Sequence, residues 1–145
     1  MTSKAVLLTL VLVLVLGMAA AAPATAGELR ATIRNVKPQQ GKVMVGVYES
    51  AAAYKAERRF AGQELPATGS EVTATFHNLP EGTYALTVYQ DVDGDGKLNR
   101  NLVGIPTEPY GFSRDASAGL GMPSFEALAV PVGAGPAATA LSLTQ

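Results

Sequence analysis

The feature that most constrains the fold of this chain is an alternation of apolar and polar side chains along most of its length. Successive side chains of an extended strand point to opposite faces, so this period of two indicates half-buried β-strands. Turn residues separate the alternating segments, which is typical of an all-β sandwich, here of about six to seven strands. The predicted strands are residues 28–36, 42–48, 71–77, 83–90, 125–130 and 137–143.

One segment between the second and third predicted strands departs from this alternation. Residues 51–61 are rich in alanine, glutamate and arginine, which favour a helix. Ser50 stands where a hydroxyl group can cap the first turn. Because Tyr54 and Phe60 do not share one helical face, we expect a short helical insertion of irregular turns.

The N-terminus carries the pattern of a secretory signal peptide. Lys4 supplies a positive charge, Ala5–Leu16 is an apolar run, and Ala24-Thr25-Ala26 gives the small-x-small motif that a signal peptidase cleaves. We therefore expect cleavage after Ala26, which makes residues 1–26 the signal peptide.

Residues 27–145 then have the length of one domain, and we expect a single β-sandwich that is periplasmic or secreted. The alternative is that residues 5–22 remain as an uncleaved anchor. A helix needs ~20 apolar residues to span a bilayer, so that run is barely long enough. Pro23 and the alanine-rich end of the run favour cleavage, and we expect no membrane contact afterwards.

Composition narrows the possible partners and the sources of stability. The chain has no cysteine, so packing or a bound ion must stabilise the domain without disulfides. Its formal net charge is -1, and it has no basic stripe of the kind that nucleic acid requires. Nucleic acid is therefore not an expected partner.

The segment Asp91–Asn99 has the strongest chemical signal in the chain. Calcium-binding loops place side-chain oxygens at positions 1, 3 and 5, a glycine at 6, a backbone carbonyl at 7 and another oxygen at 9. The residues in this order are Asp91, Asp93, Asp95, Gly96, Lys97 and Asn99. We therefore predict that this segment binds calcium, with Lys97 contributing its carbonyl oxygen.

The segment is not an EF-hand. A bidentate glutamate should occupy position 12 of such a loop, but that position is Leu102 here. A predicted strand precedes the segment, where an EF-hand would have a helix. We expect Glu108 to supply the missing carboxylate, because the chain has to turn back towards the sheet.

The alternative to a calcium loop is a plain solvated turn, since Asp and Gly both tolerate the conformations that turns need. Repulsion among three carboxylates argues against it, because a turn does not require them. Calcium is favoured over magnesium by the many flexible oxygens. Zinc is disfavoured because His77 is the sole nitrogen ligand and there is no thiol. The expected role of the ion is structural.

Two stretches of the chain resemble known exported proteins. The first contains Leu79-Pro80-Glu81-Gly82-Thr83-Tyr84, which resembles a hairpin of transthyretin-like and immunoglobulin-like β-sandwiches. That resemblance implies that the leucine plugs the end of the core and that the tyrosine starts the next strand.

The second stretch is longer and more specific. It runs from Tyr89 to Ser113, includes Gly104-Ile105-Pro106-Thr107-Glu108-Pro109-Tyr110-Gly111-Phe112-Ser113, and is followed by Pro123-Ser124-Phe125-Glu126. This order is similar to the family DUF2141 of small exported bacterial proteins, over residues 29–143. The similarity implies a sandwich fold and an exported location, and it implies no known activity.

The sequence offers no constellation for catalysis, and we expect a non-catalytic protein rather than an enzyme. His77 is the sole histidine, and no Gly-x-Ser-x-Gly motif supplies a serine nucleophile. We favour a binding or accessory module of the cell envelope, whose long loop Leu102–Pro123 contacts an unknown protein or small ligand. The alternatives are a carbohydrate-binding module, disfavoured by the absence of tryptophan, and a metal-dependent hydrolase, disfavoured by the absence of a proton-transfer group.

Within this loop, Tyr110, Phe112, Leu120 and Met122 allow two interpretations. If they are exposed, they form an apolar patch suited to a partner. If they fold under the loop, they cover the end of the sandwich core. We favour the second interpretation.

Overall fold

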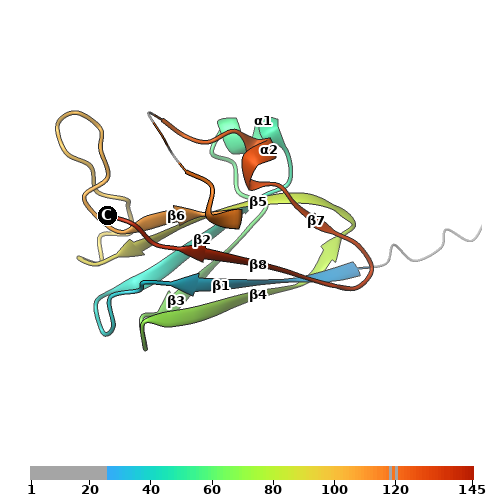
Figure 1. Ribbon diagram of the computed structural model, residues 1–145, viewed down its shortest axis with the longest axis horizontal. Coiled ribbons are helices and arrows are strands. Elements are labelled where there is room, and N and C mark those ends of the chain that lie inside the picture. Colours follow the sequence, from blue (N-terminus) through green and yellow to red (C-terminus); the bar gives the residue numbers. More distant parts are fainter. Residues whose placement is uncertain (1–25, 118, 120) are drawn as a thin grey trace, which may run out of the picture.

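The chain folds into two β-sheets that pack face to face (Figure 1), as a computed structural model describes for residues 26–117, 119 and 121–145. The predicted all-β sandwich is confirmed, with eight strands in place of the expected number of about six to seven. A finer assignment as immunoglobulin-like or transthyretin-like stays a prediction. Leu120 and the predicted signal peptide up to residue 25 lie outside the described residues.

The smaller sheet has three strands and the larger sheet has five. In the smaller sheet β1 is central, antiparallel to β4 and parallel to β8. In the larger sheet β2 and β5 are central, β3 and β6 are the edges, and β7 pairs with the start of β5. The strands are β1 Ala26–Arg34, β2 Lys42–Tyr48, β3 Ala61–Pro66, β4 Glu71–Pro80, β5 Gly82–Asp91, β6 Tyr110–Phe112, β7 Val130–Val132 and β8 Pro136–Ser142.

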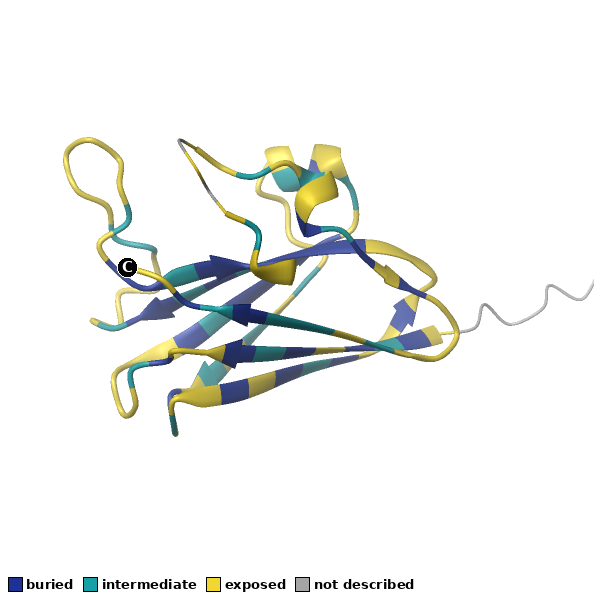
Figure 2. Ribbon diagram, in the orientation of Figure 1, coloured by how far each residue is buried: buried dark blue, intermediate teal, exposed yellow. Residues whose placement is uncertain are grey.

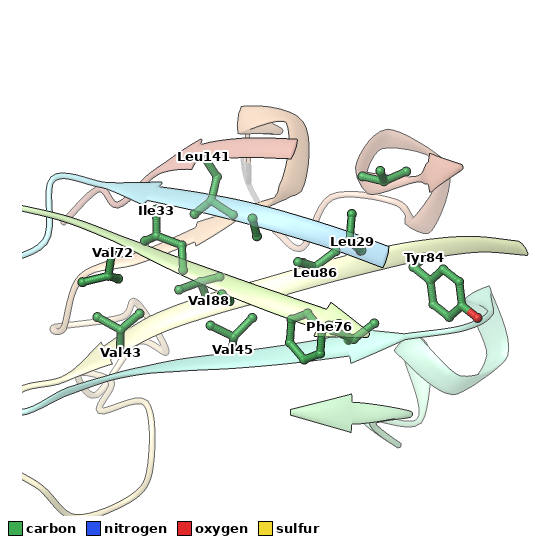
Figure 3. Packing of buried hydrophobic residues seen from close by; sticks show 14 of the residues in the cluster. Leu29, Ile33, Val43, Val45, Val72, Phe76, Tyr84, Leu86, Val88 and Leu141 are labelled. Atoms are coloured by element: carbon green, nitrogen blue, oxygen red, sulfur yellow. The ribbon is translucent and has the colours of Figure 1, made fainter. Parts of the chain in front are cut away.

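An apolar layer between the sheets is built from the inward-facing residues of the alternating strands. From the smaller sheet, Leu29 and Ile33 of β1 point towards the larger one, where Val43 and Val45 of β2 meet them (Figure 3). Leu86 of β5 completes this part of the layer, and all these side chains are buried. All buried apolar residues of the described part lie between residues 29 and 143, so residues 27–145 contain a complete core.

The turn between β4 and β5 shows the features that its sequence resemblance implied. Leu79 is buried at the end of the core, and Tyr84 is buried near the start of β5. The hydroxyl group of Tyr84 donates a hydrogen bond to the carbonyl oxygen of Pro80 at 2.7 Å. This bond fixes the first residues of β5 against the preceding turn.

The helical insertion is present but shorter than predicted. Helix α1 spans Ala51–Lys55, and the Oγ of Ser50 accepts a hydrogen bond from the N–H of Ala53, as expected of a cap. The chain does not continue as a helix to residue 61, because it turns into strand β3 beside β2. This strand was not predicted: its residues are only half-buried or exposed, so its apolar alternation is weak.

The predicted strand at residues 125–130 is wrong for its first part. Phe125–Leu128 forms helix α2, and the chain becomes extended again only at Val130. Ser124 caps this helix. Its first and last residues, Phe125 and Leu128, lie three positions apart on one helical face, so both contact the small apolar cluster that includes Tyr48. No helix in the described part of the chain is long and apolar enough to span a bilayer.

The predicted loop Leu102–Pro123 also contains regular structure. Strand β6 pairs with β5, and a short 3-10 turn, η1 (Ser113–Asp115), follows it. Phe112 is buried, Tyr110 is half-buried, and their rings meet edge to face with centroids 5.8 Å apart. The interpretation that these residues fold under the loop is therefore confirmed for Tyr110 and Phe112, but it is wrong for Met122, which is exposed.

We predict that Leu86→Ala lowers the free energy of unfolding by about 2–5 kcal/mol, because this leucine is fully buried and its truncation leaves a cavity. The same substitution at Leu102, which is fully exposed, should change that free energy by less than ~0.5 kcal/mol. Urea unfolding of residues 27–145, followed by circular dichroism, measures both values. Equal losses in the two variants would contradict this assignment of the core.

Candidate cation site

The acidic loop starts from a strand that is held on both sides. β5 pairs with β2 from Ala85 to Asp91 and with β6 near its end, so its last residue, Asp91, has a fixed backbone position. Asp91 is buried, whereas Asp93 and Asp95 are exposed. The loop therefore begins with one buried carboxylate and continues with two that face solvent.

The carboxylate of Asp91 shapes the loop by accepting three backbone hydrogen bonds. Its Oδ1 accepts from the N–H of Gly94 at 2.9 Å and from that of Asp95 at 3.1 Å. Its Oδ2 accepts from the N–H of Gly96 at 2.9 Å. The backbone from residue 91 to residue 96 is consequently curled around one carboxylate group.

Two glycines make this curl possible. Gly94 and Gly96 have φ angles of 78° and 77°, in the left-handed region that residues with a Cβ atom adopt only under strain. The predicted sharp turn at Gly96 is thus confirmed. Gly94 has the same role, which the spacing of a calcium loop did not indicate.

The three aspartates converge in space. Asp91, Asp93 and Asp95 each present a carboxylate oxygen, and these oxygens lie within 4.8 Å of one another. Asp93 accepts a hydrogen bond from the backbone N–H of Asp95 at 3.1 Å, and Asp95 accepts one from the backbone N–H of Lys97 at 2.8 Å. Because a carboxylate has about four lone-pair sites, these bonds leave electron pairs available to a cation.

Asn99 closes the loop onto Asp93. Its Nδ2 donates a hydrogen bond to Oδ2 of Asp93. The N–H of Asp95, and secondly the amide of Asn99, hold the pKa of Asp93 below its ordinary value of 3.8. Hydrogen bonds donated to a carboxylate favour its charged form, so Asp93 stays ionised in mildly acidic solution.

Glu108 lies at the base of the loop and joins its two ends. It is 5 % exposed, and its Oε1 accepts a hydrogen bond from the N–H of Val92 at 2.8 Å. Its Oε2 accepts from the N–H of Asn99 at 3.0 Å. The predicted return of the chain towards the sheet is present, since Pro109 accepts a hydrogen bond from the N–H of Gln90.

The structure thus distributes the predicted ligands over three positions. The three aspartates form the cluster, Asn99 lies beside it, and Glu108 is bound to the loop backbone at its base. Lys97 directs its N–H towards Asp95, and the contribution of its carbonyl oxygen stays a prediction.

Two supporting residues were not predicted from the sequence. The hydroxyl group of Tyr89 donates a hydrogen bond to the carbonyl oxygen of Gly96 at 3.0 Å. The pKa of this tyrosine is raised, first by burial and secondly by the negative charge of Asp91. Gln90 is fully buried, and its Nε2 donates to the carbonyl oxygens of Lys37 and Gln40 at 2.7 and 2.6 Å. Tyr89 could have been suspected from its place two residues before Asp91, but nothing in the sequence marks Gln90.

The donor set of this cluster is suited to a hard cation. It offers carboxylate oxygens, with an amide group and backbone groups nearby. The sole histidine, His77, lies on β4 of the other sheet, where its Nδ1 is 3.0 Å from Oε2 of Glu28. The cluster is therefore matched to ions that prefer oxygen ligands.

Comparison with known proteins gives one match. A model of the family DUF2141, described as an uncharacterized protein conserved in bacteria, matches residues 31–140. No curated protein and no solved structure matches the chain. The match covers most of the sandwich, the acidic loop and the segment that follows it.

We predict that Glu108→Ala, measured in EDTA, lowers the free energy of unfolding by about 2–4 kcal/mol. Two part-buried backbone N–H groups, of Val92 and Asn99, lose a charged acceptor in this variant. A hydrogen bond to a charged group contributes about 1.5–3 kcal/mol, and water can replace part of this at a part-buried position. Glu126→Ala is the matched control, because Glu126 is exposed on helix α2. A stability of the Glu108 variant equal to that of the control would exclude this bridging role.

We also predict that Asp93 titrates below pH 3.8 in the folded, ion-free domain, as carboxyl chemical shifts measured by NMR can show. A depressed folded-state pKa means that this carboxylate stabilises the fold above its unfolded pKa, and that the contribution is lost as pH falls through the folded pKa. Asn99→Ala should raise the pKa of Asp93 towards its ordinary value. An unchanged pKa in that variant would show that the side-chain bond has no influence.

Proposed function

The chain belongs to the uncharacterized bacterial family DUF2141, and we propose that it is an exported, non-catalytic module of the cell envelope that binds calcium. The ion is held by the loop Asp91–Asn99. The segment Leu102–Pro123, which follows the calcium loop, provides the surface for a partner. The expected location, periplasmic or secreted, is supported by the signal-peptide pattern of residues 1–26.

The observation that carries the calcium proposal is the convergence of three carboxylates on a preformed loop. Oxygens of Asp91, Asp93 and Asp95 lie within 4.8 Å of one another, so a single ion can contact all three. Their negative charges repel one another in its absence, and a cation reverses this interaction. Because hydrogen bonds to Asp91 already curl the backbone, binding costs little additional ordering.

Calcium fits this donor set better than the competing ions. It accepts about six to eight oxygen ligands in flexible geometry, whereas magnesium demands a near-ideal octahedron and retains water. Zinc prefers nitrogen and sulfur ligands, and the chain has one histidine and no cysteine.

Three further residues complete the proposed site. Lys97 offers its carbonyl oxygen, and Asn99 offers its side-chain oxygen once its amide turns from the bond that it now donates to Asp93. Glu108 was predicted as a direct ligand, but both of its oxygens accept backbone N–H groups. Its contacts support a role in holding the two ends of the loop, and direct ligation is the alternative.

The surroundings of the cluster favour a structural role for the ion over a catalytic one. The groups that contact the three carboxylates are backbone N–H groups and the amide of Asn99, which do not act as general bases. An ion present at about a hundred times its dissociation constant adds roughly 2.7 kcal/mol to the free energy of unfolding. In a chain without cysteine, this is a substantial contribution.

We predict that millimolar calcium raises the thermal midpoint of residues 27–145 by about 10 °C relative to EDTA, through mass action on the folded state. Magnesium at the same concentration should raise it much less. Differential scanning calorimetry measures these midpoints. Identical midpoints in calcium and EDTA would contradict the calcium site and indicate that the loop is an ordinary turn.

Charge-matched variants separate ion binding from simple charge removal. The double variant Asp93→Asn/Asp95→Asn should lose the calcium-induced shift. The control Glu57→Gln/Glu126→Gln removes the same charge from exposed positions outside the loop and should retain it. Calcium affinity of Glu108→Ala then tests direct ligation: an affinity equal to that of the unaltered domain would exclude it.

A further inference from the structure

We propose that the side chains of Leu102, Val103 and Ile105, here called the apolar tip, insert into the surface of a lipid bilayer and bind the domain peripherally to a membrane. This inference deepens the proposed binding role of the Leu102–Pro123 segment, on which it rests, by naming its partner. It does not depend on calcium. It differs from the expectation from sequence that membrane contact ends with removal of the signal peptide.

The apolar tip is exposed to an unusual degree. Leu102, Val103 and Ile105 are 107 %, 77 % and 58 % exposed, and they fall within four consecutive residues. Figure 2 shows the outer part of this segment as exposed where it projects from one end of the sandwich, between β5 and β6. Single exposed apolar residues are normal on proteins, but a contiguous group marks a binding surface.

The tip is presented by a hydrogen-bonded turn. The N–H of Asn101 donates to the carbonyl oxygen of Ile105 at 2.9 Å, and the N–H of Gly104 donates to the carbonyl oxygen of Asn101 at 3.0 Å. Gly104 has a φ angle of 82°, which closes the turn. The three apolar side chains are therefore held outward by the backbone conformation.

Polar side chains pair with further backbone groups near the tip. The Oδ1 of Asn101 accepts hydrogen bonds from the N–H groups of Val103 and Ile105, both at 3.0 Å. Arg100 donates from Nη1 to the carbonyl oxygen of Gly104 at 3.0 Å. Four of the five N–H groups of residues 101–105 thus have an acceptor within the chain. An apolar medium penalises unpaired backbone groups, so this pairing suits entry into a bilayer.

Shape and composition favour a bilayer over a protein as the occupant. A protein interface buries about 800 Å² per partner and relies on tryptophan, tyrosine and arginine at its centre, whereas leucine and valine are under-represented there. The tip offers only three aliphatic side chains on a convex turn. A fluid bilayer needs no complementary shape, and its affinity follows from the apolar area inserted.

Acidic and basic side chains lie together at the base of the tip. The exposed Lys97 and Arg100 offset half of the formal charge of Asp91, Asp93, Asp95 and Glu108. A divalent cation held by the aspartates balances the remaining charge, so calcium removes a repulsion from anionic headgroups. The affinity for the bilayer then follows from the apolar area that is inserted.

The absence of tryptophan from the chain allows a direct test. We expect the fluorescence of Leu102→Trp, in residues 27–145, to shift to the blue on addition of vesicles of phosphatidylethanolamine and phosphatidylglycerol. Met122→Trp is the matched control, because Met122 is also exposed, at 59 %, but lies outside the tip. A shift confined to the first variant supports insertion. No shift for Leu102→Trp, or an equal shift in both variants, overturns it.

Co-sedimentation of the tryptophan-free chain with the same vesicles gives a second readout. We expect Leu102→Ser/Val103→Ser to weaken the partition constant at least about tenfold, since insertion energy scales with apolar area. The thermal midpoint of this variant should stay unchanged, because both side chains are exposed. Equal partition of variant and parent, in EDTA and in calcium, overturns the proposal. The calcium proposal is judged separately, by its thermal shift in the absence of vesicles.

Discussion

The apolar layer between the two sheets is the interaction on which the whole fold depends. A chain without cysteine has no disulfide between its sheets, so the burial of facing side chains is the main interaction that holds them together. β1 and β5 are the central contributors: β1 lies in the middle of the smaller sheet, and β5 pairs with three other strands. Their inward residues, such as Leu29 and Leu86, are completely buried. Loops at the ends of these strands can vary in chemistry because the layer fixes where they begin.

Buried polar groups then close the end of the sandwich that carries the acidic loop. Gln90 binds the backbone of the β1–β2 connection, and Glu108 binds the backbone at both ends of the acidic loop. Such groups are costly to bury unless their hydrogen bonds are satisfied, and here every buried side-chain nitrogen and oxygen of the described residues has a partner. A carboxylate cluster and an apolar tip follow one another on this rigid end. The proposed ion site and the proposed membrane contact therefore share one base, and Glu108 supports both.

Sequence reasoning succeeded where side-chain periodicity and turn chemistry agree. β2 has the predicted bounds, Lys42–Tyr48, because its valines alternate without interruption. It failed where pairing or packing overrides the local pattern. Phe125–Leu128 alternates like a strand, yet a serine cap and a nearby apolar cluster make it a helix. β3 and β6 have weak patterns of their own, and each is extended because it pairs with a central strand.

For the site, the spacing of Asp91, Asp93 and Asp95 was enough to predict that their carboxylates converge, because Gly94 and Gly96 permit a tight curl between them. The sequence by itself therefore determined the sandwich class, the position of the acidic loop and its donor atoms. Only the tertiary structure decided that Glu108 binds the loop backbone at its base, and that Leu102, Val103 and Ile105 project while Phe112 is buried. The physical reason is that periodicity and spacing describe neighbours along the chain. Contacts between residues 16 positions apart in the chain, such as that of Glu108 with Val92, depend on how the sheets bring the two segments together.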